Sequence, residues 1–310
     1  ALEQAAAIRR GEVSSEELAC LYLERIERYN DALNAFIHVD PDRVLKHARL
    51  RDAQSRTESL DTLPVFHGVP TGIKDLVLTK GTPTKLGSRS YRYFVAPYDA
   101  PVARRIEAGG FVSLGKLSTS EFGVLPTTEP DIHPPTRNPW NLGHTPGGSS
   151  GGSGAAVAAG LIPIAHGSDG GGSVRIPSAL CHLYGFKPSL SLLGNLHGKY
   201  NRLGISVMGP LGRYVRDAAA MLDVMAGVPD PHTRQGGTCL HACDRALPSL
   251  KIGLMTSSPI GEPSQEVVEA IESFATTLQS LGHEVVAIDP YRGTLDEFLP
   301  VWCYAVSGVP

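Results

Sequence analysis

Residues 146–178, PGGSSGGSGAAVAAGLIPIAHGSDGGGSVRIPS, contain two clusters rich in glycine and serine on either side of a short apolar segment. Eleven of the 34 glycines of the chain fall between positions 143 and 172. Glycine weakens helices and strands by roughly 0.5–1 kcal/mol relative to alanine, so this density indicates a backbone that takes unusual angles or closely approaches a ligand. Each cluster precedes a helix candidate. We therefore expect free N–H groups at both loop-to-helix junctions, where an anion binds well.

The segments around this centre predict an α/β fold. Upstream, the apolar segments 68–78 and 111–117 are strand candidates, and a helix candidate at 100–110 separates them. Downstream, residues 249–289 repeat the order strand, helix, strand. Nearer the N-terminus, a capping box of Ser14 and Glu17 starts one helix, and Asp40 followed by Pro41 starts another. Such alternation is typical of a sheet with helices on both faces.

Composition and charge exclude several classes of function. The 28 basic and 31 acidic residues are scattered without blocks, which argues against nucleic acid as a partner. No apolar run reaches the roughly 18 residues of a membrane span, so no membrane association is expected. The five cysteines are widely spread, which favours a cytoplasmic protein without disulfides. Cys239, His241 and Cys243 lack a second ligand pair at zinc spacing, so we expect no metal and interpret them as a surface loop.

Three familiar motifs do not account for the two clusters. A phosphate-binding P-loop needs a lysine that neither cluster has, and the setting of a dinucleotide fingerprint is missing as well. The GGSSG segment matches the nucleophile elbow G-x-S-x-G around Ser149, with His283 as a nominal base. An elbow follows an apolar strand, whereas RNPWNLGHTP, residues 137–146, is a polar loop. Ser113 and Lys116 spell S-x-x-K, but no K-T-G follows. Binding of an oxyanion remains the consistent interpretation.

The chain resembles the amidase signature family over almost its whole length. GIKD around Lys74, PGGSSGGSGAAVAAG around Ser149 and GSDGGGSVRIPSALC around Ser173 carry the resemblance, together with TRNPWNLG and YGFKPS. The spacings of 75 residues from Lys74 to Ser149 and 24 from Ser149 to Ser173 are similar to those of the family. The loop GSDGGGS is closer to hydrolases of small or cyclic amides, such as 6-aminohexanoate cyclic dimer hydrolase, than to the GTDTGGS of the tRNA-dependent amidotransferase subunit.

The resemblance implies an amide-bond hydrolase with a central mixed β-sheet sandwiched between α-helices. It makes Ser173 the nucleophile, Ser149 the bridging serine on a cis peptide bond, and Lys74 the base. The oxyanion hole comes from the N–H groups of Gly170, Gly171, Gly172 and Ser173, with Ser150, Asp169 and Arg175 in support, the last two as an ion pair. The expected ligand is a small linear or cyclic carboxamide, no cofactor is expected, and a homodimer is left open. The alternative is an amidotransferase-type or catalytically silent subunit that needs a partner chain.

A lysine can accept a proton only when it is neutral, and burial away from acidic groups lowers its pKa by several units. Asp75 follows Lys74 directly, but successive side chains of a strand point to opposite faces, so the two residues need not pair. His182 stands where the family usually has glycine after Cys181, which we expect to be a core residue. Family members are longer than 310 residues. We therefore expect a single domain over 1–310 that lacks its C-terminal part, with a catalytic core at about 65–226.

Overall fold

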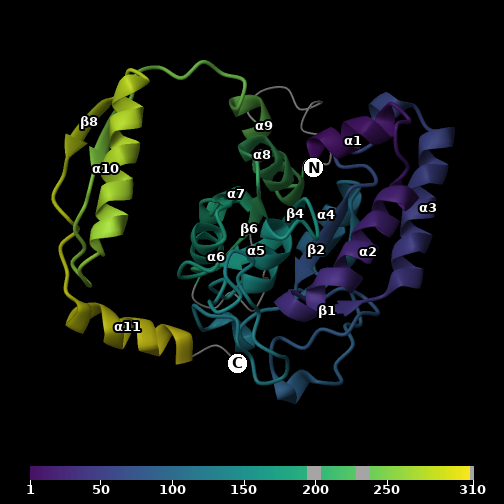
Figure 1. The fold of residues 1–310 in the computed structure, drawn as a ribbon, viewed down its shortest axis with the longest axis horizontal. Coiled ribbons are helices and arrows are strands. Elements are labelled where there is room, and N and C mark those ends of the chain that lie inside the picture. The colour runs from purple at the N-terminus through teal and green to yellow at the C-terminus, as the bar shows by residue number, and fades with distance from the viewer. Residues whose placement is uncertain (194–203, 228–237, 308–310) are drawn as a thin grey trace. The chain divides into compact units, whose positions relative to one another are not determined.

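The computed structural model describes residues 1–193, 204–227 and 238–307, and the chain divides into two compact units, 1–243 and 244–310 (Figure 1). The first unit holds every residue that the sequence predicts for the active site. The single domain over 1–310 stays a prediction.

The first unit contains a sheet in the order β1-β3-β2-β4-β6-β5. β2 runs parallel to both β3 and β4, whereas the pairs β1–β3, β4–β6 and β5–β6 are antiparallel. The expected mixed sheet is thus confirmed. The described strands of this sheet are β1 (Phe36–Val39), β2 (Pro70–Lys74), β3 (Val112–Leu117), β4 (Ile164–Asp169), β5 (Tyr184–Gly185) and β6 (Val207–Gly212).

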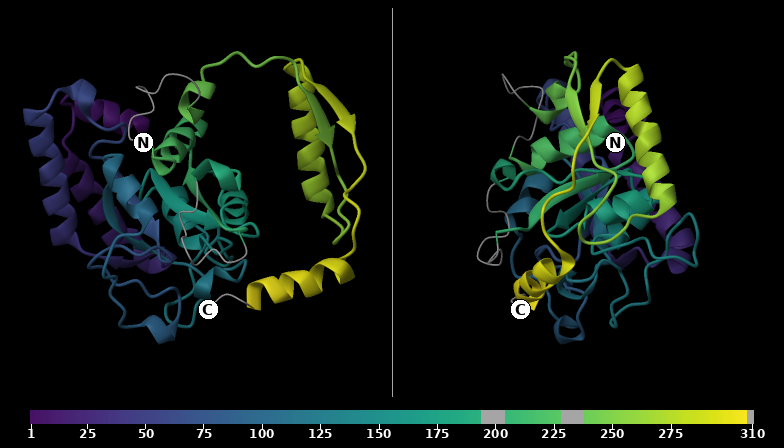
Figure 2. Two further views of the ribbon diagram at one scale, coloured as in Figure 1. Left: turned by 180° about the vertical axis from the view of Figure 1, so that it is seen from behind. Right: turned by 90° about the vertical axis from the view of Figure 1, so that its left-hand side faces the viewer.

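Helices cover both faces of this sheet, and each face has its own apolar cluster. Ile164 packs in a cluster with α4 and α8, whereas the next residue, Ala165, packs in a second cluster with α2, α3 and α5. α2 and α3 lie side by side (Figures 1 and 2). The α-helices in the described part of this unit are α1 (Leu2–Arg9), α2 (Ser15–Leu33), α3 (Pro41–Thr57), α4 (Pro101–Ala108), α5 (Gly151–Ala158), α6 (Arg175–Leu180), α7 (Leu190–Leu193), α8 (Val215–Met225) and α9 (Cys239–Ala242). Over the described ranges, none of the chain's helices combines the length and apolar character that crossing a membrane requires.

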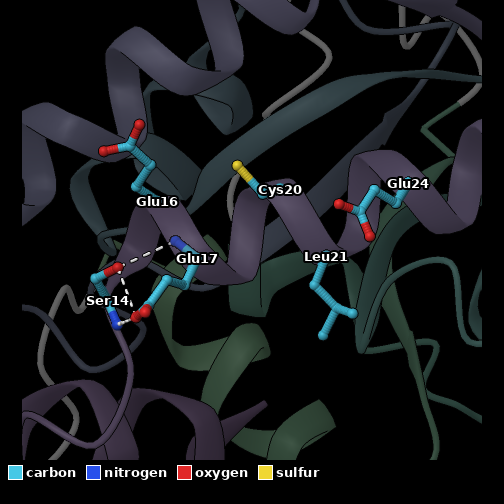
Figure 3. Close-up of a pocket in the computed structure, with 6 residues that line it drawn as sticks. All are labelled: Ser14, Glu16, Glu17, Cys20, Leu21 and Glu24. Atoms are coloured by element: carbon cyan, nitrogen blue, oxygen red, sulfur yellow. Dashed lines mark hydrogen bonds between the residues drawn. The ribbon is translucent and has the colours of Figure 1, made fainter.

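The predicted capping box starts α2 (Figure 3). The Ser14 hydroxyl accepts a hydrogen bond from the N–H of Glu17 at 3.0 Å, and the Ser14 N–H donates to the Glu17 carboxylate at 2.7 Å. The Asp40 carboxylate caps α3 in the same way and accepts from the N–H of Arg43 at 3.1 Å. The surface hollow drawn in Figure 3 is lined by residues of this helix start and holds none of the predicted site residues.

The second unit confirms the predicted order of strand, helix and strand. The parallel strands β7 (Lys251–Leu254) and β8 (Glu284–Ala287) are joined by α10 (Gln265–Ser280), and α11 (Leu295–Ser307) follows. Gly282 takes a φ of +89° just after α10, where a left-handed residue commonly ends a helix. Ser264 stands at the N-cap of α10, although its hydroxyl makes no capping hydrogen bond.

The segment around Cys239 differs from the expected surface loop. Residues Cys239–Ala242 form the short helix α9. The carboxylate of Asp223 accepts hydrogen bonds from the N–H groups of Cys239 and Leu240 at 2.9 and 2.8 Å. These bonds satisfy free donors at the start of the helix, and Asp223 stands sixteen residues before Cys239. Local sequence patterns therefore do not reveal them.

Candidate active site

The two glycine- and serine-rich clusters meet at the end of β2. Lys74 is the last residue of β2, and β4, its parallel neighbour, leads directly into the loop that carries Ser173. Ser149 directly precedes Ser150, the N-cap residue of α5. The N–H of Ser150 donates to the carbonyl oxygen of Ser173 at 3.2 Å, which joins the first cluster to the second. Parallel strands end at the same edge of a sheet, so residues distant in sequence come together here.

Lys74 is fully buried and faces hydroxyl groups. Its Nζ atom donates to Ser149 Oγ at 2.7 Å and to Ser168 Oγ at 3.1 Å. Burial lowers the pKa of Lys74 to about 7, although the negative charge of Asp169 acts in the opposite direction. A substantial fraction of this lysine is therefore a neutral amine near neutral pH, as a general base requires.

Asp75 turns away from Lys74, as strand geometry predicts. Its carboxylate lies 3.5 Å from Nζ of the fully buried Lys116 and accepts from the N–H of Lys85 at 2.9 Å. Burial raises the pKa of Asp75, and the charge of Lys116 opposes that rise. Burial also disfavours the charged form of Lys116 and lowers its pKa to about 8. The carboxylate next to Lys74 in sequence thus has its own cation.

The loop before Ser173 folds around the buried carboxylate of Asp169. This carboxylate accepts from the N–H groups of Gly172 at 2.8 Å and Val174 at 3.1 Å. Arg175 binds both carboxylate oxygens, at 2.8 and 3.0 Å, so the expected ion pair is present. Burial alone would raise the pKa of Asp169, but the hydrogen bonds from Arg175, Val174 and Gly172 outweigh it and lower the pKa.

These hydrogen bonds reduce the number of N–H groups that are available for the expected oxyanion hole. The N–H of Gly172 already points to Asp169, so it is not free for a substrate oxygen. The carboxylate takes none of the N–H groups of Gly170, Gly171 or Ser173. Gly172 has a φ of +129°, which glycine adopts far more readily than other residues.

The segment around Ser149 is not a nucleophile elbow. Turns and irregular backbone precede Ser149 where an elbow requires a strand, and the Gly148–Ser149 peptide bond is cis. The neighbouring Ser150 hydroxyl donates to the carbonyl oxygen of Ser168 at 3.2 Å, and the Ser168 N–H donates back to it at 3.3 Å. Ser150 therefore ties the first cluster to β4.

Ser168 is a site residue that sequence motifs do not single out. Its hydroxyl lies 3.1 Å from Lys74 Nζ, and its carbonyl oxygen lies 3.4 Å from the same atom. The available signal is a hydroxyl-bearing residue at the position where the amidotransferase loop GTDTGGS has its first threonine. Lys116 stands out in the sequence only as part of an S-x-x-K string, which gives no hint of its pairing with Asp75.

Cys181 and His182 lie beside the site loops. Cys181 is fully buried, as predicted, and burial raises the pKa of its thiol to about 12. His182 takes a φ of +57°, in the left-handed region that glycine adopts easily, which accounts for the glycine usual at this position. Its ring packs edge-on against Trp140, with the ring centroids 6.1 Å apart.

The mixed sheet and the two glycine- and serine-rich clusters are those of an amidase-family protein. It belongs to the amidase family, whose model matches residues 17–307. AmiB2 of Mycobacterium tuberculosis, named as an amidase, is 41% identical over 312 residues, which cover 99% of this chain and 66% of that protein. A glutamyl-tRNA(Gln) amidotransferase subunit of Methylococcus capsulatus is 39% identical over 300 residues, which cover 94% of this chain and 57% of that relative.

Solved structures of amidases share the fold. The structure of 6-aminohexanoate cyclic dimer hydrolase superposes with a TM-score of 0.83 at 35% identity, covering 93% of this chain and 60% of the hydrolase. A bacterial aryl acylamidase of the amidase signature family gives a TM-score of 0.86 at 27% identity, covering 98% of this chain and 66% of the enzyme. The chain therefore spans less than two thirds of the length of these relatives.

Proposed function

We propose that the protein hydrolyses small linear or cyclic carboxamides, with Ser173 as the nucleophile, Ser149 as the proton relay and neutral Lys74 as the base. The observation that carries the proposal is the 2.7 Å contact between Nζ of the fully buried Lys74 and Ser149 Oγ. The pKa of about 7 supports it, because a lysine with its ordinary pKa would be protonated and unable to accept a proton.

In the proposed acylation step, Ser173 Oγ bonds to the amide carbon as its proton passes to Ser149, whose own proton passes to Lys74. The carbonyl oxygen becomes an oxyanion, for which the N–H groups of Gly170, Gly171 and Ser173 are the candidate donors. The C–N bond then breaks, the nitrogen takes a proton from Ser149, and Ser149 recovers one from the Lys74 ammonium. Water repeats the sequence on the ester of Ser173 and releases a carboxylic acid.

A fluorophosphonate probe tests this assignment on the full-length protein. The Ser173 oxygen forms a bond to phosphorus while fluoride leaves, and peptide mass spectrometry identifies the labelled residue. We expect labelling of Ser173 that is lost in Ser173→Ala and strongly slowed in Lys74→Ala. Lys46→Ala, at an exposed lysine of α3, is the matched control and keeps the parent rate. An unlabelled Ser173, or an unchanged rate in Lys74→Ala, contradicts the proposal.

The second candidate is an amidotransferase-type or catalytically silent subunit that needs a partner chain. The 39% identity to the amidotransferase subunit favours it. Aryl, aliphatic and cyclic amides, with glutamine as a further substrate, distinguish the two candidates in the full-length protein. A stand-alone hydrolase releases carboxylic acid from one of the three classes, whereas a silent subunit releases none without a partner. A homodimer and a cytoplasmic location stay predictions.

A further inference from the structure

Gly123, which has no side chain, lies next to the hydroxyl of Ser149. It ends the short 3₁₀ helix Glu121–Gly123 and has a φ of +75°. A Cβ atom at this position would lie 3.4 Å from Ser149 Oγ, in van der Waals contact. The same Cβ would lie 2.7 Å from Cδ1 of Leu76, closer than such atoms pack. Gly123 thus lies beside the bridging serine, and Leu76 lies against Gly123.

The turn that carries Gly123 is held from two directions. The N–H of Phe122 donates to the carbonyl oxygen of Leu86 at 2.9 Å, and the N–H of Gly123 donates to that of Ser120 at 3.0 Å. The Phe122 ring meets Tyr91 edge-on at a centroid distance of 6.0 Å. A wall fixed in this way selects among substrates by size, because it cannot move aside without breaking these contacts.

Ser149 is the group that the leaving nitrogen must reach. Proton transfer needs the two heavy atoms within about 2.6–3.2 Å, and Nζ of Lys74 already occupies one side of the hydroxyl at 2.7 Å. Ser149 is 1% exposed, whereas Gly123 and Leu76 are both partly exposed. A substituent on the nitrogen therefore has its path toward solvent alongside these two residues.

We infer that Gly123 and Leu76 form the subsite for the amine portion of the substrate and limit the size of the group on the leaving nitrogen. This inference rests on the proposed function, in which Ser149 protonates that nitrogen. The absence of a side chain at Gly123 admits amides whose nitrogen carries a carbon substituent. A side chain there would contact the hydroxyl itself and leave room only for a primary amide.

Two substrates with one acyl group, a primary amide and the matching anilide, test the inference on the full-length protein. In Gly123→Ala we expect kcat/KM for the anilide to fall at least tenfold more than that for the primary amide. Leu76→Ala opens the same space and raises the anilide-to-primary ratio. Because Leu76 Cδ1 is the clashing atom, the double variant recovers part of the loss in Gly123→Ala. Gly11→Ala, at a glycine with a φ of +70° and no neighbour within 4 Å, controls for backbone strain.

Leu76→Phe keeps the inference testable if Gly123→Ala does not fold, because it enlarges the side chain next to Gly123 without changing the glycine backbone. It should lower the anilide-to-primary ratio. Equal losses of kcat/KM for the primary amide and the anilide overturn the inference. Fluorophosphonate labelling of Ser173 involves no leaving nitrogen, so it reports separately on the proposed function. If Ser173 of the parent protein is not labelled, the proposed function is wrong. If labelling is normal but the variants leave the anilide-to-primary ratio unchanged, only the subsite inference is wrong.

Discussion

Lowering the pH from 8 to 6 is expected to reduce kcat/KM for amide hydrolysis about tenfold, because protonation removes the base Lys74. With its pKa at about 7, the neutral fraction of Lys74 is about 0.9 at pH 8 and about 0.1 at pH 6. The rate should follow this fraction, with a slope of one in log kcat/KM against pH below the midpoint and a plateau above it.

The assay measures kcat/KM for an amide without ionisable groups from pH 5 to pH 10, with circular dichroism to show that the fold persists. The folded pKa of Lys74 lies below its ordinary value of 10.5, so its burial costs stability progressively as the pH falls from about 10.5 to about 7. Below that window the cost is constant, and loss of rate at pH 6 is not unfolding driven by Lys74. The rate of fluorophosphonate labelling should depend on pH in the same way as kcat/KM. A midpoint above pH 9, or a flat profile, would refute the assignment of Lys74 as a neutral base.

Three further predictions concern neighbours of the catalytic residues. Ser168→Ala removes a hydroxyl acceptor of Lys74 and should lower kcat about tenfold with little change in KM, measured with a single amide substrate. Arg175→Ala leaves the buried carboxylate of Asp169 without its cation. Because the Arg175 side chain is half-exposed, we expect the free energy of unfolding, measured by urea denaturation, to fall by about 1–2 kcal/mol, and acylation to slow. Unchanged stability would contradict the bracing role. Cys181, with a pKa of about 12, should resist iodoacetamide at pH 8 in the folded protein, and rapid alkylation there would show that its thiol is not buried as described.

Features that depend on neighbours in sequence were predictable. The capping box of Ser14 and Glu17, the cap at Asp40 and a strand within residues 68–78 follow from local patterns, and the structure confirms them. The end of that strand at Lys74 was not predicted. The opposite directions of Lys74 and Asp75 follow from the two-residue period of a strand. The mixed topology of the sheet came from the family resemblance, because no local pattern tells a parallel neighbour from an antiparallel one.

Features that depend on closure of the chain in three dimensions were not predictable. Four consecutive N–H groups precede Val174, and only the folded loop decides that Gly172 donates to Asp169. The partner of Asp75 is Lys116, on the neighbouring strand, which no spacing rule connects to it. The carboxylate of Asp223 similarly reaches the start of α9 from another helix.

The alternation of side chains at the end of β2 makes the register of the sheet a requirement for catalysis. The N–H of Asp75 donates to the carbonyl oxygen of Leu117 at 2.9 Å, so the ladder with β3 extends one residue beyond Lys74. A slip of β2 by one residue would exchange the two faces. It would bring a carboxylate to the serine hydroxyls, and it would move the amine to the side that now holds a second lysine. An insertion or deletion of one residue in this strand is therefore a catalytic lesion even where the core still packs.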